Sequence, residues 1–163
     1  DMFLFSFYTR GMSFIDMAYL KKSDLKNSVI IYRRRKTGQQ LSIKWEKCME
    51  EIIAKYNGCS TAQYLLPIIT NPCVNERTQY RNAISRINVA LKEVACLAGL
   101  NMPLTMHCAR HSWATTARRV GVPLGVISQG MGHRSEATTQ IYLDSIDTSV
   151  VDRANDRVIA SLG

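Results

Sequence analysis

Residues 106–115 combine side chains that can bind a phosphate with side chains that can move a proton. His107, Arg110 and His111 stand three and four positions apart, a spacing that puts side chains on one face of a helix. Arginine gives a phosphate paired hydrogen bonds without losing its charge, and histidine exchanges protons near neutral pH. The pattern fits an active-site wall, and it also fits a surface helix whose polar residues have no function.

A second segment, residues 130–142, holds another histidine and a tyrosine nine positions after it. Gly132 permits a tight turn directly before His133, and Ser135 is suited to cap a following helix that carries Tyr142. On one straight helix His133 and Tyr142 would lie roughly 13 Å apart, so a loop must fold His133 back if both serve one site. Alternatively, Tyr142 is a half-buried aromatic on an amphipathic helix.

The elements that would position these residues are mainly helical. Residues 2–20 read as two helical pieces hinged near Gly11, with Ser13 as an N-cap. Residues 27–35 favour a strand, and a turn at 37–38 before a return strand at 40–43 predicts a hairpin. The expected fold class is therefore mainly α with a small antiparallel β-hairpin or sheet (α+β). Further helices are expected at 44–56, 78–100, 106–120, 124–130, 136–145 and 148–161, with 58–76 mostly loop.

Length and charge narrow the class of protein. The 163 residues suit one domain, and the formal net charge is +8. This basic excess favours a polyanionic partner, because each phosphate neutralised by Lys or Arg releases counterions. A solvated basic surface without a partner would have the same composition. Five cysteines without C-x-x-C spacing indicate neither a zinc ribbon nor a redox dithiol.

The sequence shows no apolar run long enough to cross a bilayer and no signal peptide. Residues 1–8 are too apolar for a natural free terminus and read as a helix cut within its length. We therefore expect the chain to be a fragment that something precedes in the full protein, and we expect a cytoplasmic location.

The two segments together resemble the tyrosine recombinase (phage integrase) family, whose signature is H-x-x-R-H, then L-G-H, then a tyrosine. Met131 stands where the family often has Leu, and the order and spacing otherwise match. The resemblance covers essentially the whole chain, including the hairpin and the N-terminal helices. It implies the tyrosine recombinase catalytic-domain fold for residues 1–163, with the N-terminal core-binding domain of the full protein absent.

The resemblance implies a transesterification on DNA that needs no metal or other cofactor. Tyr142 would attack a phosphodiester, form a 3′-phosphotyrosyl link and release a 5′-hydroxyl. Arg110 would bind the non-bridging oxygens, which gain charge in the transition state. His107 would accept the tyrosine proton, and His133 would donate a hydrogen bond to the phosphate. His111 would orient its neighbours.

In this family a lysine at the tip of a β-hairpin protonates the leaving 5′-oxygen, with the hairpin against the DNA minor groove. Lys36 matches that position in a K-T-G turn. Alternatively, Lys36 only contacts backbone phosphates, the role expected for Arg33, Arg34 and Arg35. Arg134, directly after His133, is also expected to contact DNA.

The chain departs from the family pattern at another arginine, usually found in G-[LM]-R-x-S-E-L. Aligning Asp16 with the family's acidic residue puts Ser13 where that arginine belongs. Arg10 lies three residues earlier, almost one helical turn, and the segment resembles recombinases of Bacteroides-type bacteria and their mobile elements. We assign the role to Arg10, with Ser13 as the alternative position. Asp16 is expected to orient an arginine or anchor the helix.

The function implied is site-specific recombination of double-stranded DNA, by integration, excision or inversion, in a bacterial nucleoid. Alternatives are a type IB topoisomerase-like relaxing enzyme and a non-catalytic DNA-binding module built on residues 122–142. The resemblance implies a homotetramer on DNA for the full protein, and we expect the fragment to be monomeric and to have no membrane partner. A C-terminal helix at 148–161 would dock either on its own domain or on a neighbouring protomer.

Overall fold

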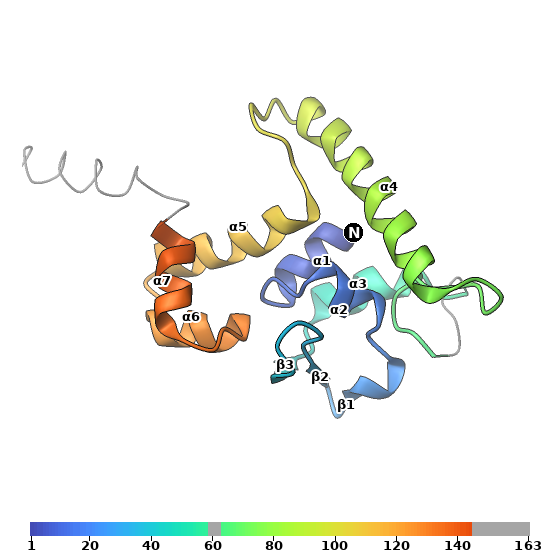
Figure 1. Ribbon diagram of the computed structural model, residues 1–163, viewed down its shortest axis with the longest axis horizontal. Coiled ribbons are helices and arrows are strands. Elements are labelled where there is room, and N and C mark those ends of the chain that lie inside the picture. Colours follow the sequence, from blue (N-terminus) through green and yellow to red (C-terminus); the bar gives the residue numbers. More distant parts are fainter. Residues whose placement is uncertain (59–62, 145–163) are drawn as a thin grey trace, which may run out of the picture. The chain divides into compact units, whose positions relative to one another are not determined.

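The computed structural model describes residues 1–58 and 63–144, which form parts of two compact units (Figure 1). The first unit comprises residues 1–113 and the second begins at residue 114. The helix expected at 148–161 lies outside the described residues.

The first unit is built mainly of helices, and their positions confirm most of the elements expected from sequence. In chain order these helices are α1 (Met2–Tyr8), α2 (Phe14–Ala18), the 3-10 helix η1 (Lys22–Asp24), α3 (Lys47–Ala54), α4 (Glu76–Leu97) and the beginning of α5 (Met106–Arg119).

A three-stranded antiparallel sheet contains the expected hairpin, with strand order β1-β2-β3. Its strands are β1 (Leu25–Lys26), β2 (Val29–Arg33) and β3 (Gln40–Lys44). The predicted strand at 27–35 is too long, because Asn27 and Ser28 adopt positive φ angles of 51° and 58°. They form the turn into β2 and create a third strand that the sequence pattern did not predict.

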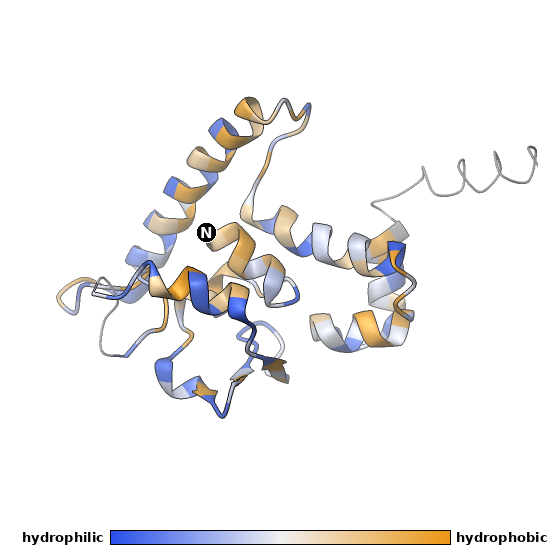
Figure 2. Ribbon diagram, turned by 180° about the vertical axis from the view of Figure 1, so that it is seen from behind, coloured by the Kyte–Doolittle hydropathy of each residue, from blue (hydrophilic) through white to orange (hydrophobic). Residues whose placement is uncertain are grey.

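The core of the first unit lies between the sheet and the helices. Alternate residues of β2 and β3 point into it, whereas Ile31 and Arg33 are exposed. Figure 2 shows α1 as largely hydrophobic, and its Phe5 is fully buried. The region after residue 62 forms no helix before α4, as expected, but it is not a surface loop. Its apolar side chains join the core: Tyr64, Leu65, Leu66, Ile68 and Ile69.

Polar caps set two of the helix boundaries. The Ser13 hydroxyl accepts a hydrogen bond from the Asp16 amide at the beginning of α2, which confirms the predicted cap. The Asn75 side chain accepts hydrogen bonds from the amides of Arg77 and Thr78. Therefore α4 begins at Glu76, two residues before the predicted start.

The second unit contains the end of α5 together with α6 (Leu124–Met131) and α7 (Glu136–Asp144). Helices α6 and α7 pack against each other. Ile127, Met131 and Leu143 are their large, fully buried side chains. Seven α-helices and one small antiparallel sheet across the described residues confirm the expected fold class.

Candidate active site

Arg110 is held by the turn between α1 and α2. Its Nη1 donates a hydrogen bond of 2.8 Å to the carbonyl oxygen of Gly11, which is 99 positions away in the sequence. A Cβ atom on Gly11 would lie 2.7 Å from Cγ and 2.8 Å from Cα of Arg110, closer than real Cβ contacts allow. Gly11 also has a φ of 74°. This turn can therefore approach α5 only because residue 11 is glycine.

Arg10 occupies a backbone position that usually belongs to glycine. Its φ is 60°, and its amide bonds to the Phe7 carbonyl while the Gly11 amide bonds to the Ser6 carbonyl. These two bonds define a Schellman motif with Arg10 at its left-handed residue, a conformation that costs a non-glycine residue roughly 1–2 kcal/mol. The side chain then reaches β3, where its Nη1 lies 3.4 Å from the Ser42 carbonyl oxygen.

Asp16 connects α2 to the end of β2. Its carboxylate accepts a hydrogen bond of 2.6 Å from the Ser13 hydroxyl and another of 2.8 Å from the Arg35 amide. The Nε atom of Arg34 lies 3.9 Å from the same carboxylate. Ser13, the alternative position for the missing family arginine, is therefore linked through Asp16 to the base of the hairpin.

Arg34 was expected, like Arg33 and Arg35, to contact the DNA backbone, and in the structure its side chain is buried. It is only 7% exposed, because the alternation of β2 continues past the end of the strand and turns this side chain inward, beside Asp16. The alternation itself was visible in the sequence, since Arg34 follows the buried Ile30 and Tyr32 at the same period of two.

Tyr32 is a buried residue of this region, and its sequence context indicated only a preference for a β-strand. Burial raises the pKa of its phenol, and the Asp16 carboxylate raises it further. The nearby charges of Arg34, Arg110 and Arg10 act in the opposite direction. Three arginines, from α5, from the position directly after β2 and from the α1–α2 turn, therefore lie within electrostatic reach of one phenol.

His107 and His111 lie together on α5, with ring centroids 4.4 Å apart in an edge-to-face arrangement. Burial lowers the pKa of His107, and the charges of Arg110 and Lys36 lower it further. Burial also lowers the pKa of His111, followed by the effects of His107 and Arg110. The first unit thus brings Lys36 within electrostatic reach of His107, and near neutral pH it favours the neutral imidazole that can accept a proton.

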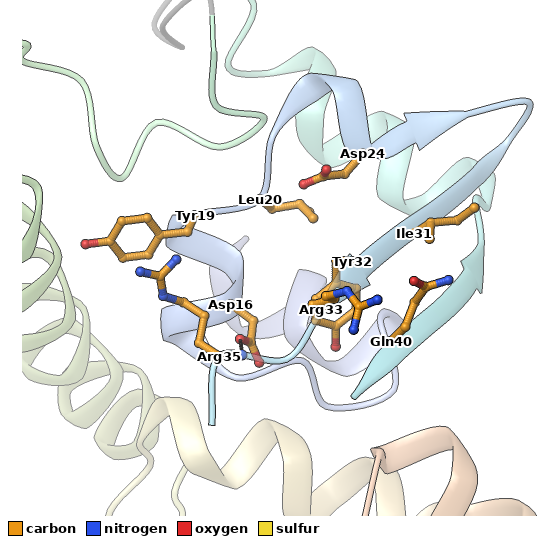
Figure 3. Close-up of a pocket in the computed structure, with 9 residues that line it drawn as sticks. All are labelled: Asp16, Tyr19, Leu20, Asp24, Ile31, Tyr32, Arg33, Arg35 and Gln40. Carbon is orange, nitrogen blue, oxygen red and sulfur yellow. Dashed lines mark hydrogen bonds between the residues drawn. The ribbon is translucent and has the colours of Figure 1, made fainter. Parts of the chain in front are cut away.

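The remaining hairpin arginines line a pocket between the α2–η1 region and the β2–β3 hairpin (Figure 3). Arg33 is exposed, and its Nη1 lies 3.3 Å from the Gly38 carbonyl oxygen. The Arg35 guanidinium stacks on the Tyr19 ring, 3.7 Å from the ring centroid. Both cations therefore remain accessible, unlike Arg34.

In the second unit, a helix end positions His133. Gly132 ends α6 in the left-handed conformation, with φ 64° and ψ 43°. The Gly132 amide bonds to the Gln129 carbonyl and the His133 amide to the Ser128 carbonyl, which is again a Schellman motif. The chain therefore reverses immediately at His133.

This reversal brings His133 to Tyr142. Their ring centroids are 5.7 Å apart with an interplanar angle of 72°, much closer than the separation expected along a straight helix. His133 Nδ1 lies 2.8 Å from the hydroxyl of Thr139, a fully buried residue of α7. Thr139 was not singled out from the sequence, although it lies three positions before Tyr142 on one helical face. Arg134 is exposed.

No group of three His, Cys, Asp or Glu side chains is placed to hold a metal ion in residues 1–58 and 63–144. Within the same ranges, every helix is too short or too polar to span a bilayer.

The fold is that of a tyrosine recombinase catalytic domain. The structure of a XerA recombinase superposes with a TM-score of 0.67 and 23% identity over 96% of this chain and 55% of that one. XerH bound to a palindromic difH substrate gives a TM-score of 0.65 and 17% identity over 94% of this chain and 44% of that one.

The chain belongs to the phage integrase family, whose profile matches residues 2–148. The tyrosine recombinase XerA of Thermococcus kodakarensis is 30% identical over 141 residues, which are 83% of this chain and 47% of that protein. XerC of Syntrophus aciditrophicus is 25% identical over 141 residues, 83% of this chain and 46% of that protein. The chain therefore spans about half the length of these relatives.

Proposed function

We propose that this chain is the catalytic part of a site-specific recombinase that cleaves and rejoins double-stranded DNA through a 3′-phosphotyrosyl intermediate. The observation that carries the proposal is the 5.7 Å separation of the His133 and Tyr142 rings. The turn at the end of α6 holds His133 beside Tyr142. A phosphate attacked by the Tyr142 hydroxyl would therefore lie next to a histidine that can donate a hydrogen bond to it.

In the proposed reaction, the Tyr142 oxygen forms a bond to phosphorus and its proton passes to His107. The bond from phosphorus to the 5′-oxygen breaks, and Lys36 supplies the proton that this oxygen takes. Arg110 and Arg10 stabilise the charge on the non-bridging oxygens, and His133 donates a hydrogen bond to them. In the second step a 5′-hydroxyl attacks the phosphotyrosyl bond, and the phenol leaves with a proton.

Double-stranded DNA is the proposed partner. The solved relatives include XerH bound to a difH substrate and a lambda integrase bound to a core site. The net charge of +8 supports the same partner. We further propose that the full protein acts as a homotetramer on DNA, as the family resemblance implies.

The test is covalent capture on a nicked suicide duplex, in which the cleaved strand diffuses away and the phosphotyrosyl adduct accumulates. The wild-type chain should form an adduct stable to denaturing electrophoresis. Tyr142→Phe should form none, because it lacks the attacking oxygen, while its duplex affinity stays at the wild-type value. An adduct with the Phe variant would show that another residue attacks the phosphate.

Tyr32→Phe is the matched control, since it removes a second phenol in a cationic environment. It should still form the adduct. The wild-type chain can also be tested on the DNA ends of its own natural element. If it binds this DNA but forms no adduct, the result favours a non-catalytic DNA-binding module. Relaxation of supercoiled plasmid without strand exchange between two sites would favour the topoisomerase-like alternative.

A further inference from the structure

The candidate proton donor Lys36 lies in an exposed turn, so its position depends on the residues that hold this turn. The turn closes through two backbone hydrogen bonds. The Gly38 amide donates to the Arg34 carbonyl at 2.7 Å, and the Arg34 amide donates to the Gln39 carbonyl at 2.8 Å. Within the described residues, no carboxylate pairs with the Lys36 ammonium group. Lys36 must therefore be positioned through the backbone on either side of it.

Arg35, the residue directly before Lys36, is held at two points. Its backbone amide donates a hydrogen bond of 2.8 Å to the Asp16 carboxylate. Its guanidinium group lies over the Tyr19 ring, 3.7 Å from the ring centroid, and Figure 3 shows these two side chains together. A cation over an aromatic face is attracted by the charge distribution of the ring. Arg35 is therefore tied through its backbone to α2 and through its side chain to Tyr19, which follows α2 directly.

The Tyr19 ring is itself fixed by a buried neighbour. Tyr64, which is only 5% exposed, meets this ring edge to face, with ring centroids 6.1 Å apart and an interplanar angle of 90°. The Tyr64 hydroxyl donates a hydrogen bond of 2.6 Å to the Glu76 carboxylate at the beginning of α4. A backbone bridge between Lys21 and Tyr64 holds the two segments side by side. Tyr19 therefore gives the Arg35 guanidinium a fixed support.

We propose that Tyr19 is a positioning residue for Lys36. By holding Arg35, it fixes the turn from which Lys36 reaches the leaving 5′-oxygen. A general acid must lie within hydrogen-bond reach of the atom that it protonates. Because a lysine side chain has many rotamers, its ammonium group reaches one place often only if the backbone that carries it is fixed. The inference rests on the proposed function, in which the bond from phosphorus to the 5′-oxygen breaks and Lys36 gives this oxygen its proton.

The test compares cleavage of two nicked suicide duplexes that differ only in the leaving atom. One carries the natural 5′-oxygen at the cleaved phosphate, and the other carries a bridging sulfur there. Sulfur leaves as a thiolate, whose proton affinity is far below that of an alkoxide, so it needs no general acid. Single-turnover rates at saturating DNA remove differences in affinity. The ratio of the two rates for one preparation does not depend on the fraction of the protein that is folded.

Tyr19→Leu should slow cleavage of the oxygen duplex by about tenfold, the scale of one lost cation–π contact. Its rate on the sulfur duplex should stay near the wild-type value. Tyr19→Phe keeps the aromatic face and should cleave both duplexes as the wild type does. In a Lys36→Ala background, Tyr19→Leu should cause no further loss on the oxygen duplex, because the group that it positions is already absent.

Tyr56→Leu is the matched control. Tyr56, like Tyr19, is a half-buried tyrosine packed against the core of the first unit, but its hydroxyl bonds to Asp1 at the N-terminus. The control should leave the ratio of the two rates unchanged. A change in this ratio as large as that of Tyr19→Leu would show that any loss of packing disturbs Lys36 and would overturn the inference.

The Lys36→Ala chain separates the inference from the proposed function. It should be slow on the oxygen duplex and recover on the sulfur duplex. If sulfur restores Lys36→Ala but not Tyr19→Leu, or if Tyr19→Leu is not slow on the oxygen duplex, the inference fails and the role of Lys36 stands. If sulfur does not restore Lys36→Ala, another group protonates the leaving oxygen, which overturns both the role of Lys36 and the inference. If the wild-type chain forms no adduct on either duplex, the proposed function fails, and the inference fails with it.

Discussion

The two units present their candidate functional residues in different ways. In the first unit, Arg110 depends on a contact with Gly11 that joins positions 99 residues apart. In the second, His133 reaches Tyr142 through one helix-end turn and a neighbouring helix, within a segment of fewer than twenty residues. Arg110 therefore depends on long-range packing, whereas the His133–Tyr142 pair depends mainly on local backbone conformation.

Gly11→Ala should have the largest effect, because it disrupts the contact between Gly11 and Arg110. The new Cβ would overlap Arg110 at 2.7–2.9 Å in a backbone region that alanine avoids. We expect a loss of about 2–4 kcal/mol in the free energy of unfolding, combining roughly 1 kcal/mol of backbone strain with an overpacking penalty. Adduct formation should fall in parallel, because Arg110 loses its position. Chemical denaturation and suicide-substrate cleavage measure the two effects.

Gly99→Ala is the matched control for this change. Gly99 has a φ of 65°, like Gly11, but a Cβ there would meet no atom within 4 Å. Its cost should therefore be only the backbone strain, about 1 kcal/mol, with adduct formation unchanged. If the two variants lose the same free energy of unfolding, the close approach of Arg110 to Gly11 does not contribute to the cost of Gly11→Ala.

Arg10→Ala should have the second-largest effect, on catalysis rather than on stability. Loss of one donor to the transition state lowers the cleavage rate by about two to three orders of magnitude. Arg10→Gly removes the same side chain but also relieves the positive φ of 60°, so it should be more stable than Arg10→Ala by about 1 kcal/mol and equally slow. Single-turnover cleavage and denaturation measure these effects.

Ser13→Ala tests whether Arg10 or the region of Ser13 corresponds to the family arginine near the beginning of the domain. If it slows cleavage more than Arg10→Ala does, the function belongs to the region of Ser13 and Asp16 rather than to Arg10. The hydroxyl of Ser13 contacts the Asp16 carboxylate, whose other neighbours are Arg34 and the Arg35 amide. A large effect of Ser13→Ala would then be explained by movement of that carboxylate.

Local signals made the helices, the hairpin and the Ser13 cap predictable, because each depends on residues a few positions apart. The turn at Gly132 was equally visible, and with it the requirement that His133 fold back. Strand alternation turns Arg34 inward, a placement that was not inferred from the sequence, and its expected contact with DNA stays a prediction. The close approach of Gly11 to Arg110 had no local signal, since nothing in either segment indicates the other. The extra strand β1 was missed because a two-residue strand carries almost no pattern.

The smallest of the expected effects is the pH dependence of the free energy of unfolding that His107 and His111 cause. It also distinguishes the two units, because both of these histidines belong to the first unit. Burial and neighbouring cations hold the pKa values of His107 and His111 below their ordinary value of about 6.5. Between the lowered values and 6.5 the folded chain binds fewer protons than the unfolded chain, so the free energy of unfolding falls as the pH falls through this window. Cleavage should fall only at the lower limit of this window, as the pH approaches the lowered pKa of His107 in the folded chain, because protonated His107 cannot accept the tyrosine proton.

Replacing both residues, as His107→Gln with His111→Gln, should remove much of this dependence of stability on pH between 7 and 5. The variant carries no imidazole in the first unit, because the remaining histidine, His133, belongs to the second. Denaturation curves at several pH values measure the change. A stability profile as steep as that of the wild type would place the responsible groups outside α5. The lowered pKa values would then have no measurable consequence for folding, and His133 or a carboxylate would be the next residue to replace.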